Sequence, residues 1–173
     1  MRNPNLAKER TTQRLWQGDR VSVADAIQEL GLPQSKYRML GIREWQWIER
    51  RVKDRFVRRP FSERTGIWFE DVSPAEVALG PSWDLTDLKE LAPAGTRVYA
   101  AHGADFGDLW WCEGMFASAV EVHFSANRWL ESVFVSPSFE WLLVTNHHDM
   151  LYAIGEPVSS NLAQHKNAQR IAK

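Results

Sequence analysis

Histidines and carboxylates gather in two short polar stretches of the chain, and such side chains bind metals and transfer protons. His102, Asp105 and Asp108 share one glycine-containing stretch, with Glu113 and His123 downstream; the second stretch is Asn146-His147-His148-Asp149. Zinc and two-metal hydrolases need such groups to converge in space. The spacings match no known metal motif, and a polar hairpin turn explains the second stretch equally well. We therefore predict no metal, no cofactor and no catalytic residue, and keep a small metal-dependent hydrolase as an alternative.

The single cysteine offers a second kind of chemistry. Cys112 follows Leu109-Trp110-Trp111 and precedes Glu113. An apolar setting and a neighbouring acid both raise the pKa of a thiol and lower its reactivity. The chain also lacks the Gly-x-Ser-x-Gly and Walker patterns of hydrolases and nucleotide-binding proteins. We expect Cys112 to be a buried structural residue.

Basic side chains crowd the end of the N-terminal third. Six of them fall within ten residues: Arg50, Arg51, Lys53, Arg55, Arg58 and Arg59. A guanidinium donates two parallel hydrogen bonds to a phosphate, so such a helix suits nucleic acid, with binding that weakens as salt rises. A solvated helix face, or a helix docked on the acidic half of the chain, are the alternatives.

A second basic segment lies just before this helix. Residues 22–40 contain an amphipathic pattern that ends in Leu30-Gly31, then an apolar residue, then a polar start with Lys and Arg. This pattern resembles a helix-turn-helix, whose second helix enters the major groove of DNA. The resemblance implies that four side chains face DNA: Gln34, Ser35, Lys36 and Arg38. A plain helical hairpin is the alternative.

The charge of the chain is divided between its two parts. Residues 1–65 hold fifteen Lys and Arg against eight Asp and Glu, whereas residues 66–173 hold six against fourteen. Such asymmetry indicates contact with nucleic acid or with a charged partner. The nine tryptophans favour a Trp-rich core or a binding face. We predict that the acidic part binds a basic protein partner through Trp110, Trp111, Asp105 and Asp108.

The hydrophobic pattern predicts helices in the N-terminal third and mainly strands afterwards. Trp45, Ile48, Val52 and Phe56 lie on one face of a helix over residues 43–59. Further helices are expected over 6–16, 22–30, 34–40 and 84–91, and one beginning at Ser73. Strands are expected over 67–72, 96–101, 116–124, 130–135, 140–145 and 150–154, the last two as a hairpin.

The fold class that follows is α+β. A basic helical region (1–65) precedes an acidic domain (66–157), in which a small antiparallel sheet of four to six strands packs against two short helices; residues 158–173 form a polar tail. A chain of 173 residues is long enough for one well-packed core. A lone cysteine, and the absence of a leader pattern or a long apolar run, make the cytoplasm the expected location and exclude a membrane partner.

These observations favour a non-enzymatic binding or regulatory protein. The basic helices would contact nucleic acid, and the acidic, Trp-rich domain would hold a protein partner. The first alternative is an inhibitor or immunity-type protein whose acidic face blocks a basic enzyme such as a nuclease, since acidic patches speed such association. The second is the hydrolase built on His102, Asp105 and Asp108.

Overall fold

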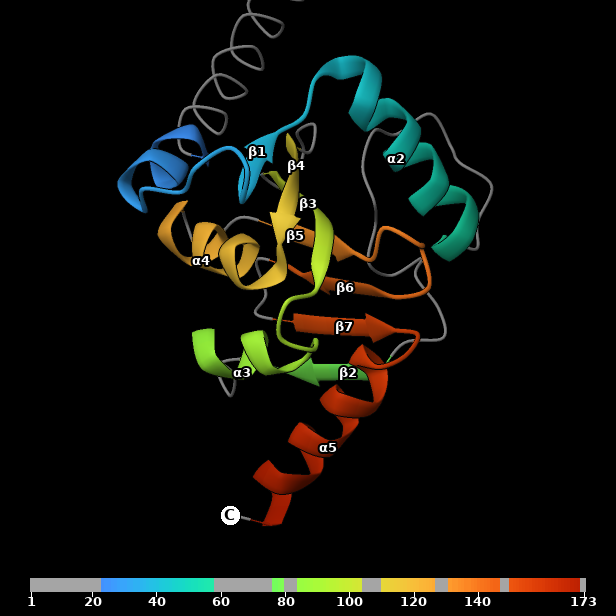
Figure 1. Ribbon diagram of the computed structural model, residues 1–173. Helices are drawn as coiled ribbons and strands as arrows, with labels where there is room; N and C mark the ends of the chain where they lie inside the picture. The colour runs from blue at the N-terminus through green and yellow to red at the C-terminus, as the bar shows by residue number, and fades with distance from the viewer. Residues whose placement is uncertain are drawn as a thin grey trace, which may run out of the picture.

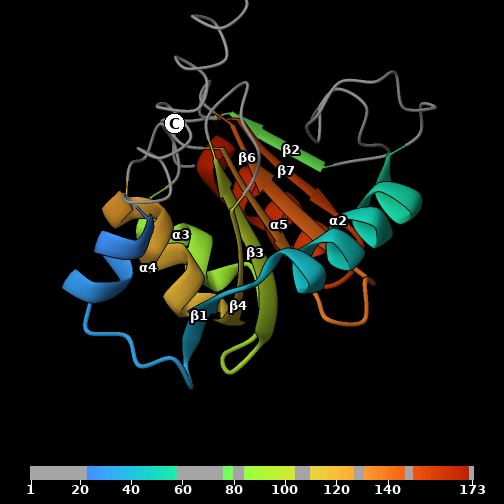
Figure 2. The same cartoon turned by 90° about the horizontal axis from the view of Figure 1, so that it is seen from above.

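The protein is built on one antiparallel sheet with helices on both of its faces (Figures 1 and 2). The computed structural model describes residues 23–57, 76–79, 84–103, 110–126, 131–146 and 150–171. Within these ranges the sheet has seven strands in the order β1-β4-β3-β5-β6-β7-β2. The α+β class is therefore confirmed. No helix in the described part of the chain is both long enough and apolar enough to cross a bilayer.

The elements alternate along the chain. The strands are β1 (Tyr37–Met39), β2 (Glu76–Leu79), β3 (Arg97–Gly103), β4 (Trp110–Met115), β5 (Glu131–Val135), β6 (Leu142–Thr145) and β7 (Met150–Ile154). The helices are α2 (Ile42–Phe56), α3 (Leu85–Glu90), α4 (Phe116–Ala126) and α5 (Val158–Ile171). Residues 23–29 are helical as well.

Each face of the sheet carries its own hydrophobic core, because successive side chains of a strand point to opposite faces. On one face Val133 and Val135 of β5 pack with Ile48, Val52 and Phe56 of α2. On the other face the core includes residues of β3, β5 and β6 together with α3, α4, α5 and residues 23–29. Figure 2 shows α2 on one side of the sheet and α3, α4 and α5 on the other.

The N-terminal third contributes to the same sheet as the acidic part of the chain. β1 pairs antiparallel with β4, and Tyr37 lies opposite Gly114. α2, which follows β1, buries its apolar stripe on strands that come much later in the sequence. The boundary expected at residue 65 lies outside the described residues, but the described parts on its two sides share one sheet and two cores.

Several elements match the sequence-based expectation. Helix α2 has the predicted apolar stripe, with Ile48, Val52 and Phe56 buried. Helix α3 begins at the predicted place, where the Asp84 carboxylate accepts hydrogen bonds from the backbone N–H groups of Thr86 and Asp87. β3, β5, β6 and β7 are confirmed as strands, and β6 pairs with β7 antiparallel as the predicted hairpin strands.

Some expectations were wrong. Residues 116–124 were predicted as a strand but form helix α4, with Phe116, Ala119, Val120 and Val122 buried. A helix that is apolar on most sides loses the 3.6-residue pattern, and its alanines favour helix over strand. The predicted sheet of four to six strands has seven, because β4 and two short edge strands, β1 and β2, had not been predicted.

Those edge strands replace predicted helices. The helix expected over 34–40 is a turn followed by β1, and the helix expected to begin at Ser73 is contradicted by β2. Both segments are short, so pairing with β4 and with β7 decides their conformation rather than their local helix propensity. The strand expected over 67–72 and the helix over 6–16 lie outside the described residues.

The C-terminal segment, expected to be a polar tail, forms helix α5 over Val158–Ile171. Val158 and Leu162 are fully or almost fully buried in the core beside α3 and α4. The side chain of Asn161 donates a hydrogen bond to the carbonyl oxygen of Leu91 at 3.0 Å. Residues 158–171 are therefore a structural part of the domain.

The pairing of β1 with β4 requires a residue without a side chain at position 114. A Cβ atom at Gly114 would collide with the carbonyl oxygen of Lys36 and with Tyr37. We expect Gly114→Ala to lower the free energy of unfolding by about 3 kcal/mol or more in urea titrations, because backbone must move. Gly31→Ala is the matched control: nothing lies within 4 Å of its Cβ position, so only its positive φ of 60° opposes the methyl group, at about 1 kcal/mol. Equal losses in the two variants would contradict this account.

Candidate functional site

Helix α2 carries a group of exposed arginines. Its apolar stripe packs on the sheet, so the opposite side of the helix faces solvent. Four guanidinium side chains of α2 are exposed: Arg43, Arg50, Arg51 and Arg55. Arg55 lies on the flank of the helix nearer to the apolar stripe. Among the described residues none of these four makes an ion pair, and Asp54 is the one exposed carboxylate between Arg50 and Arg55.

The remaining charges of α2 are engaged within the protein. Lys53 forms an ion pair with Glu49 one helical turn earlier. Glu44, in the first turn, accepts a hydrogen bond from the backbone N–H of Gly41 at 2.8 Å and is ion-paired with Arg38. The hydrogen bond from Arg38, followed by that from Gly41, lowers the pKa of Glu44. The acids of α2 therefore offset its open arginines only partly.

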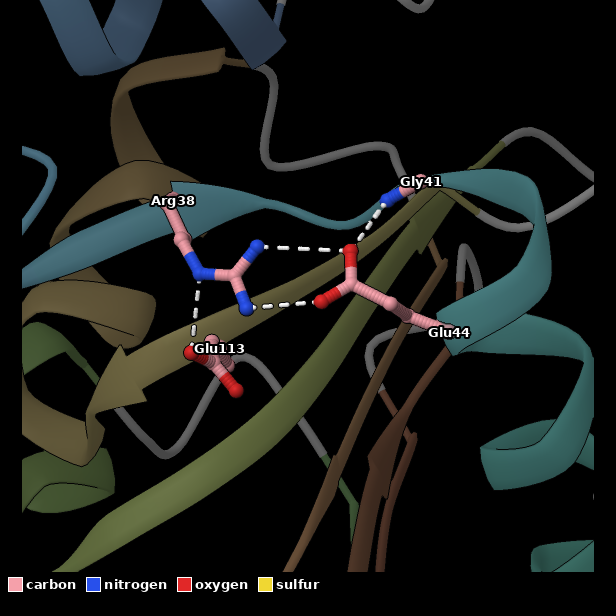
Figure 3. A network of polar contacts seen from close by, with 4 residues as sticks. All are labelled: Arg38, Gly41, Glu44 and Glu113. Atoms are coloured by element: carbon pink, nitrogen blue, oxygen red, sulfur yellow. Dashed lines mark hydrogen bonds and ion pairs between the residues drawn. The ribbon is translucent and has the colours of Figure 1, made fainter.

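Arg38 ties the first turn of α2 to the edge of the sheet (Figure 3). Its Nη2 atom lies 2.8 Å from Oε1 of Glu44, and its Nε atom lies 2.9 Å from Oε1 of Glu113 on β4. Arg38 and Glu113 are also direct partners in the register of β1 and β4. The carboxylates of Glu44 and Glu113 raise the pKa of Arg38 above its ordinary value. Arg38 is thus a structural link between β1, β4 and α2.

The four residues predicted from the helix-turn-helix resemblance do not share a helix. Gln34, Ser35 and Lys36 are exposed in the turn before β1, and Arg38 is on β1 with its guanidinium held by two carboxylates of its own chain. Of the six predicted residues of the basic helix, Arg50, Arg51 and Arg55 are exposed and Lys53 is half-buried. Arg58 and Arg59 lie outside the described residues.

The predicted partner-binding residues differ in their exposure to solvent. Trp111 is 1% exposed and packs in the core beneath α2, so its assignment to a partner surface was wrong. The adjacent Trp110 is half-buried at the start of β4. Alternation along the strand explains the difference, since neighbouring side chains point to opposite faces. Asp105 and Asp108 lie outside the described residues.

Two of the histidines that sequence analysis singled out meet in the core, on the face of the sheet opposite α2. The Ser132 hydroxyl lies 2.8 Å from Nδ1 of His102 and 2.7 Å from Nδ1 of His123, and the Tyr37 hydroxyl lies 2.8 Å from Nε2 of His102. His102 and Ser132 are 0% exposed and His123 is 1% exposed. We call these four residues, Tyr37, His102, His123 and Ser132, the buried histidine cluster.

Burial decides the electrostatics of this cluster. Together with the neighbouring His123, which has the smaller effect, burial lowers the pKa of His102 to about 3. Burial also raises the pKa of Tyr37 and brings the pKa of Cys112 to about 12. Cys112 is therefore a buried thiol, as predicted. Within the described residues, no three His, Cys, Asp or Glu side chains are placed to hold a metal ion.

Comparison with known proteins gives one match. A family model covers residues 15–166, most of the chain. The chain belongs to DUF6756, a family of unknown function. No curated protein and no solved structure matches the chain.

Sequence analysis missed two residues of the α2 surface. Trp47 is 51% exposed on the same side of α2 as the arginines, and its ring meets that of Phe139 edge-on with centroids 5.5 Å apart. Trp47 falls outside the apolar stripe of Trp45, Ile48, Val52 and Phe56, and a large apolar residue on the polar side of a helix was the available signal. Phe139 gave no such signal, because only the fold brings it to α2.

The buried histidine cluster predicts sensitivity to acid in this DUF6756 chain. The pKa of His102 is lower in the folded than in the unfolded protein, so the unfolded chain takes up a proton that the folded one excludes. The stabilisation is complete above about pH 6.5 and is lost as the pH falls toward about 3. We expect the free energy of unfolding in urea to fall by up to about 1.4 kcal/mol per pH unit for this group. His102→Gln should be less stable at neutral pH and show a shallower pH dependence; an unchanged slope would assign the acid sensitivity to other groups.

The Arg38 link predicts a local effect in α2. Arg38→Met keeps the length of the side chain and removes both ion pairs, which are partly exposed and so contribute modestly to global stability. We expect faster amide hydrogen exchange in the first turn of α2, near Trp45, with little change in the central strands. Arg43→Met is the matched control, because this exposed arginine makes no ion pair among the described residues. Equal effects of the two variants would remove the structural role of Arg38.

Proposed function

We propose that the protein is a non-enzymatic binding protein that holds nucleic acid on the outward face of α2. The observation that carries this proposal is the set of exposed arginines, Arg43, Arg50, Arg51 and Arg55, on one rigid helix whose other side is buried in the core. A guanidinium is a planar donor fork that matches a phosphate, and it stays charged at every physiological pH.

Two further observations support phosphate as the ligand of this face. Of the three acids of α2, Glu44 and Glu49 are paired with Arg38 and Lys53, which leaves Asp54 alone against the four exposed arginines. Helix α2 docks on the sheet through Ile48, Val52 and Phe56 and not through its basic side chains. The arginines are therefore available to an external polyanion, whose released counterions would drive binding.

The acidic part of the chain forms the second half of the proposal, as the surface for a basic protein partner. Asp84, Glu90, Glu140 and Glu156 are exposed, and Trp110 is half-buried. An inhibitor that works through this surface alone would not use the exposed arginines of α2. The buried position of Trp111 and of the two histidines lends no support to the inhibitor or hydrolase alternatives.

The test is binding to labelled single- and double-stranded DNA and RNA across a salt series. We expect affinity that falls steeply with salt. The double variant Arg50→Ala and Arg55→Ala should bind more weakly at low salt and reduce the slope of log affinity against log salt by about 1.5–2, because two phosphate contacts are lost. Neither side chain makes a hydrogen bond or ion pair among the described residues, so the fold should be kept.

The matched control removes the same number of positive charges, two, from another part of the protein. Arg97 and Lys166 are exposed on β3 and α5, outside helix α2. Their double alanine variant should retain the affinity and the salt slope of the parent protein. Absence of binding at low salt would remove the nucleic-acid proposal. An equal loss in both double variants would reduce it to general charge attraction.

A further inference from the structure

An exposed tryptophan stands among the arginines of α2. Trp47 is 51% exposed, although tryptophan has more apolar surface to bury than any other side chain. Trp45 packs with the apolar stripe of the helix, whereas Trp47 lies on the polar side, where the amphipathic pattern favours a polar residue. An indole held open to solvent offers a flat aromatic face to a ligand.

Arginines surround this indole on the helix surface. Residues three and four positions apart are neighbours on a helix. Arg43 lies four residues before Trp47, and Arg50 and Arg51 lie three and four residues after it; all three are exposed. The remaining neighbour at this spacing is Glu44, whose carboxylate is bound to Arg38 and to the backbone of Gly41. On the helix itself, the charges next to the indole are therefore mainly positive.

The turn between β5 and β6 supports the indole from the side. Phe139 is 6% exposed, and its ring contacts Trp47 edge-on at 5.5 Å and Tyr99 of β3 at 6.0 Å between centroids. The guanidinium carbon of Arg51 lies 5.5 Å from the centre of the same ring. Both Trp47 and Arg51 are thus positioned by one buried side chain before any ligand arrives, which lowers the entropy lost on binding.

The backbone of this turn is held in an uncommon conformation. Phe139 has a φ of 57°, in the left-handed region that side chains other than glycine rarely adopt. The Ser136 hydroxyl fixes the turn by accepting hydrogen bonds from the backbone N–H groups of Glu140 at 2.9 Å and Trp141 at 3.3 Å. Strain of this kind persists where the surrounding structure determines it, and it concentrates at binding sites.

We propose that Trp47, flanked by Arg43, Arg50 and Arg51, is a stacking site for an unpaired base, so that the ligand of α2 is single-stranded nucleic acid. This inference rests on the proposed function and narrows its substrate class. Indole stacking with phosphate-binding arginines is the combination by which proteins hold single strands without reading their sequence. In a duplex the faces of the bases are stacked on one another, so a duplex would engage the arginines and leave Trp47 unused. An acidic peptide would likewise use the arginines and gain little from a flat aromatic face.

The experiment compares labelled oligo(dT), oligo(rU) and a DNA duplex of equal length with the full chain and its variants by fluorescence anisotropy at fixed low salt. We expect Trp47→Ala to weaken binding of both single strands about tenfold, the loss of one stacked base, and to change duplex binding by less than about twofold. Trp47→Phe should restore much of the single-strand affinity, because it keeps an aromatic face. Its thermal unfolding and that of Trp47→Ala establish that both variants are folded.

Ile42→Ala is the matched control. Ile42 is 66% exposed at the start of the same helix, so this variant also removes exposed apolar surface but no aromatic face. It should leave both affinities unchanged. Poly-glutamate, tested in parallel, should bind more weakly than oligo(dT) and without dependence on Trp47.

The outcomes separate the two levels of the proposal. If the parent protein binds none of the polyanions, the proposed function fails and the stacking site fails with it. If it binds them, but Trp47→Ala weakens the binding of single strands and of the duplex equally or weakens neither, only the stacking site is overturned. If poly-glutamate binds as tightly as oligo(dT) and depends equally on Trp47, the ligand of α2 is an acidic protein.

Discussion

The need to cover both faces of a seven-stranded sheet governs the rest of this structure. Strands β3, β5 and β6 carry apolar side chains on both faces, so a helix on one side alone would leave the other in water. Within the described residues α2 supplies the helical cover for one face, through Ile48, Val52 and Phe56. That packing fixes the rotation of α2 about its axis. The same packing therefore decides which side chains of α2 point to solvent, and these include its arginines and Trp47.

The opposite face accommodates polar groups where α4 crosses the sheet. Buried hydroxyl and imidazole groups are tolerated in a core when they are hydrogen-bonded to one another. Ser132 lies between His102 and His123, and Tyr37 reaches His102 from the edge strand. Four elements, β1, β3, α4 and β5, thus meet in one hydrogen-bonded group. Such a group is more demanding than apolar packing, because each member needs its partners in register.

The parts of the fold that sequence analysis predicted are those whose pattern is local. The stripe of α2, the short helix α3 and the β6–β7 hairpin each follow from residues within a short window. Helix α4 was missed because burial on most of its surface removes the polar side that marks a helix. β1 and β2 were missed because three or four residues carry little pattern, and distant partners decide their conformation.

The same distinction applies to the candidate site. The basic helix was predicted from composition, and Arg50, Arg51 and Arg55 are exposed on it. The support of Trp47 by Phe139 could not be predicted, since the two residues belong to segments far apart in the sequence and meet only through the tertiary fold. Trp111 was misplaced because a pair of adjacent tryptophans gives no indication of which one points inward. The position of β4 within the sheet decides that Trp111 is the one that points inward.

Both edge strands pair with partners that are synthesised much later. The contact of Arg38 with Glu113 spans 75 residues, and β2 pairs with β7, near the C-terminus. Closing loops of this length costs chain entropy before any pairing is gained, and such topologies fold slowly. On the ribosome, the apolar stripe of α2 emerges well before the strands that cover it. The apolar side chains of this basic segment therefore stay uncovered in the nascent chain until most of the sheet has been translated.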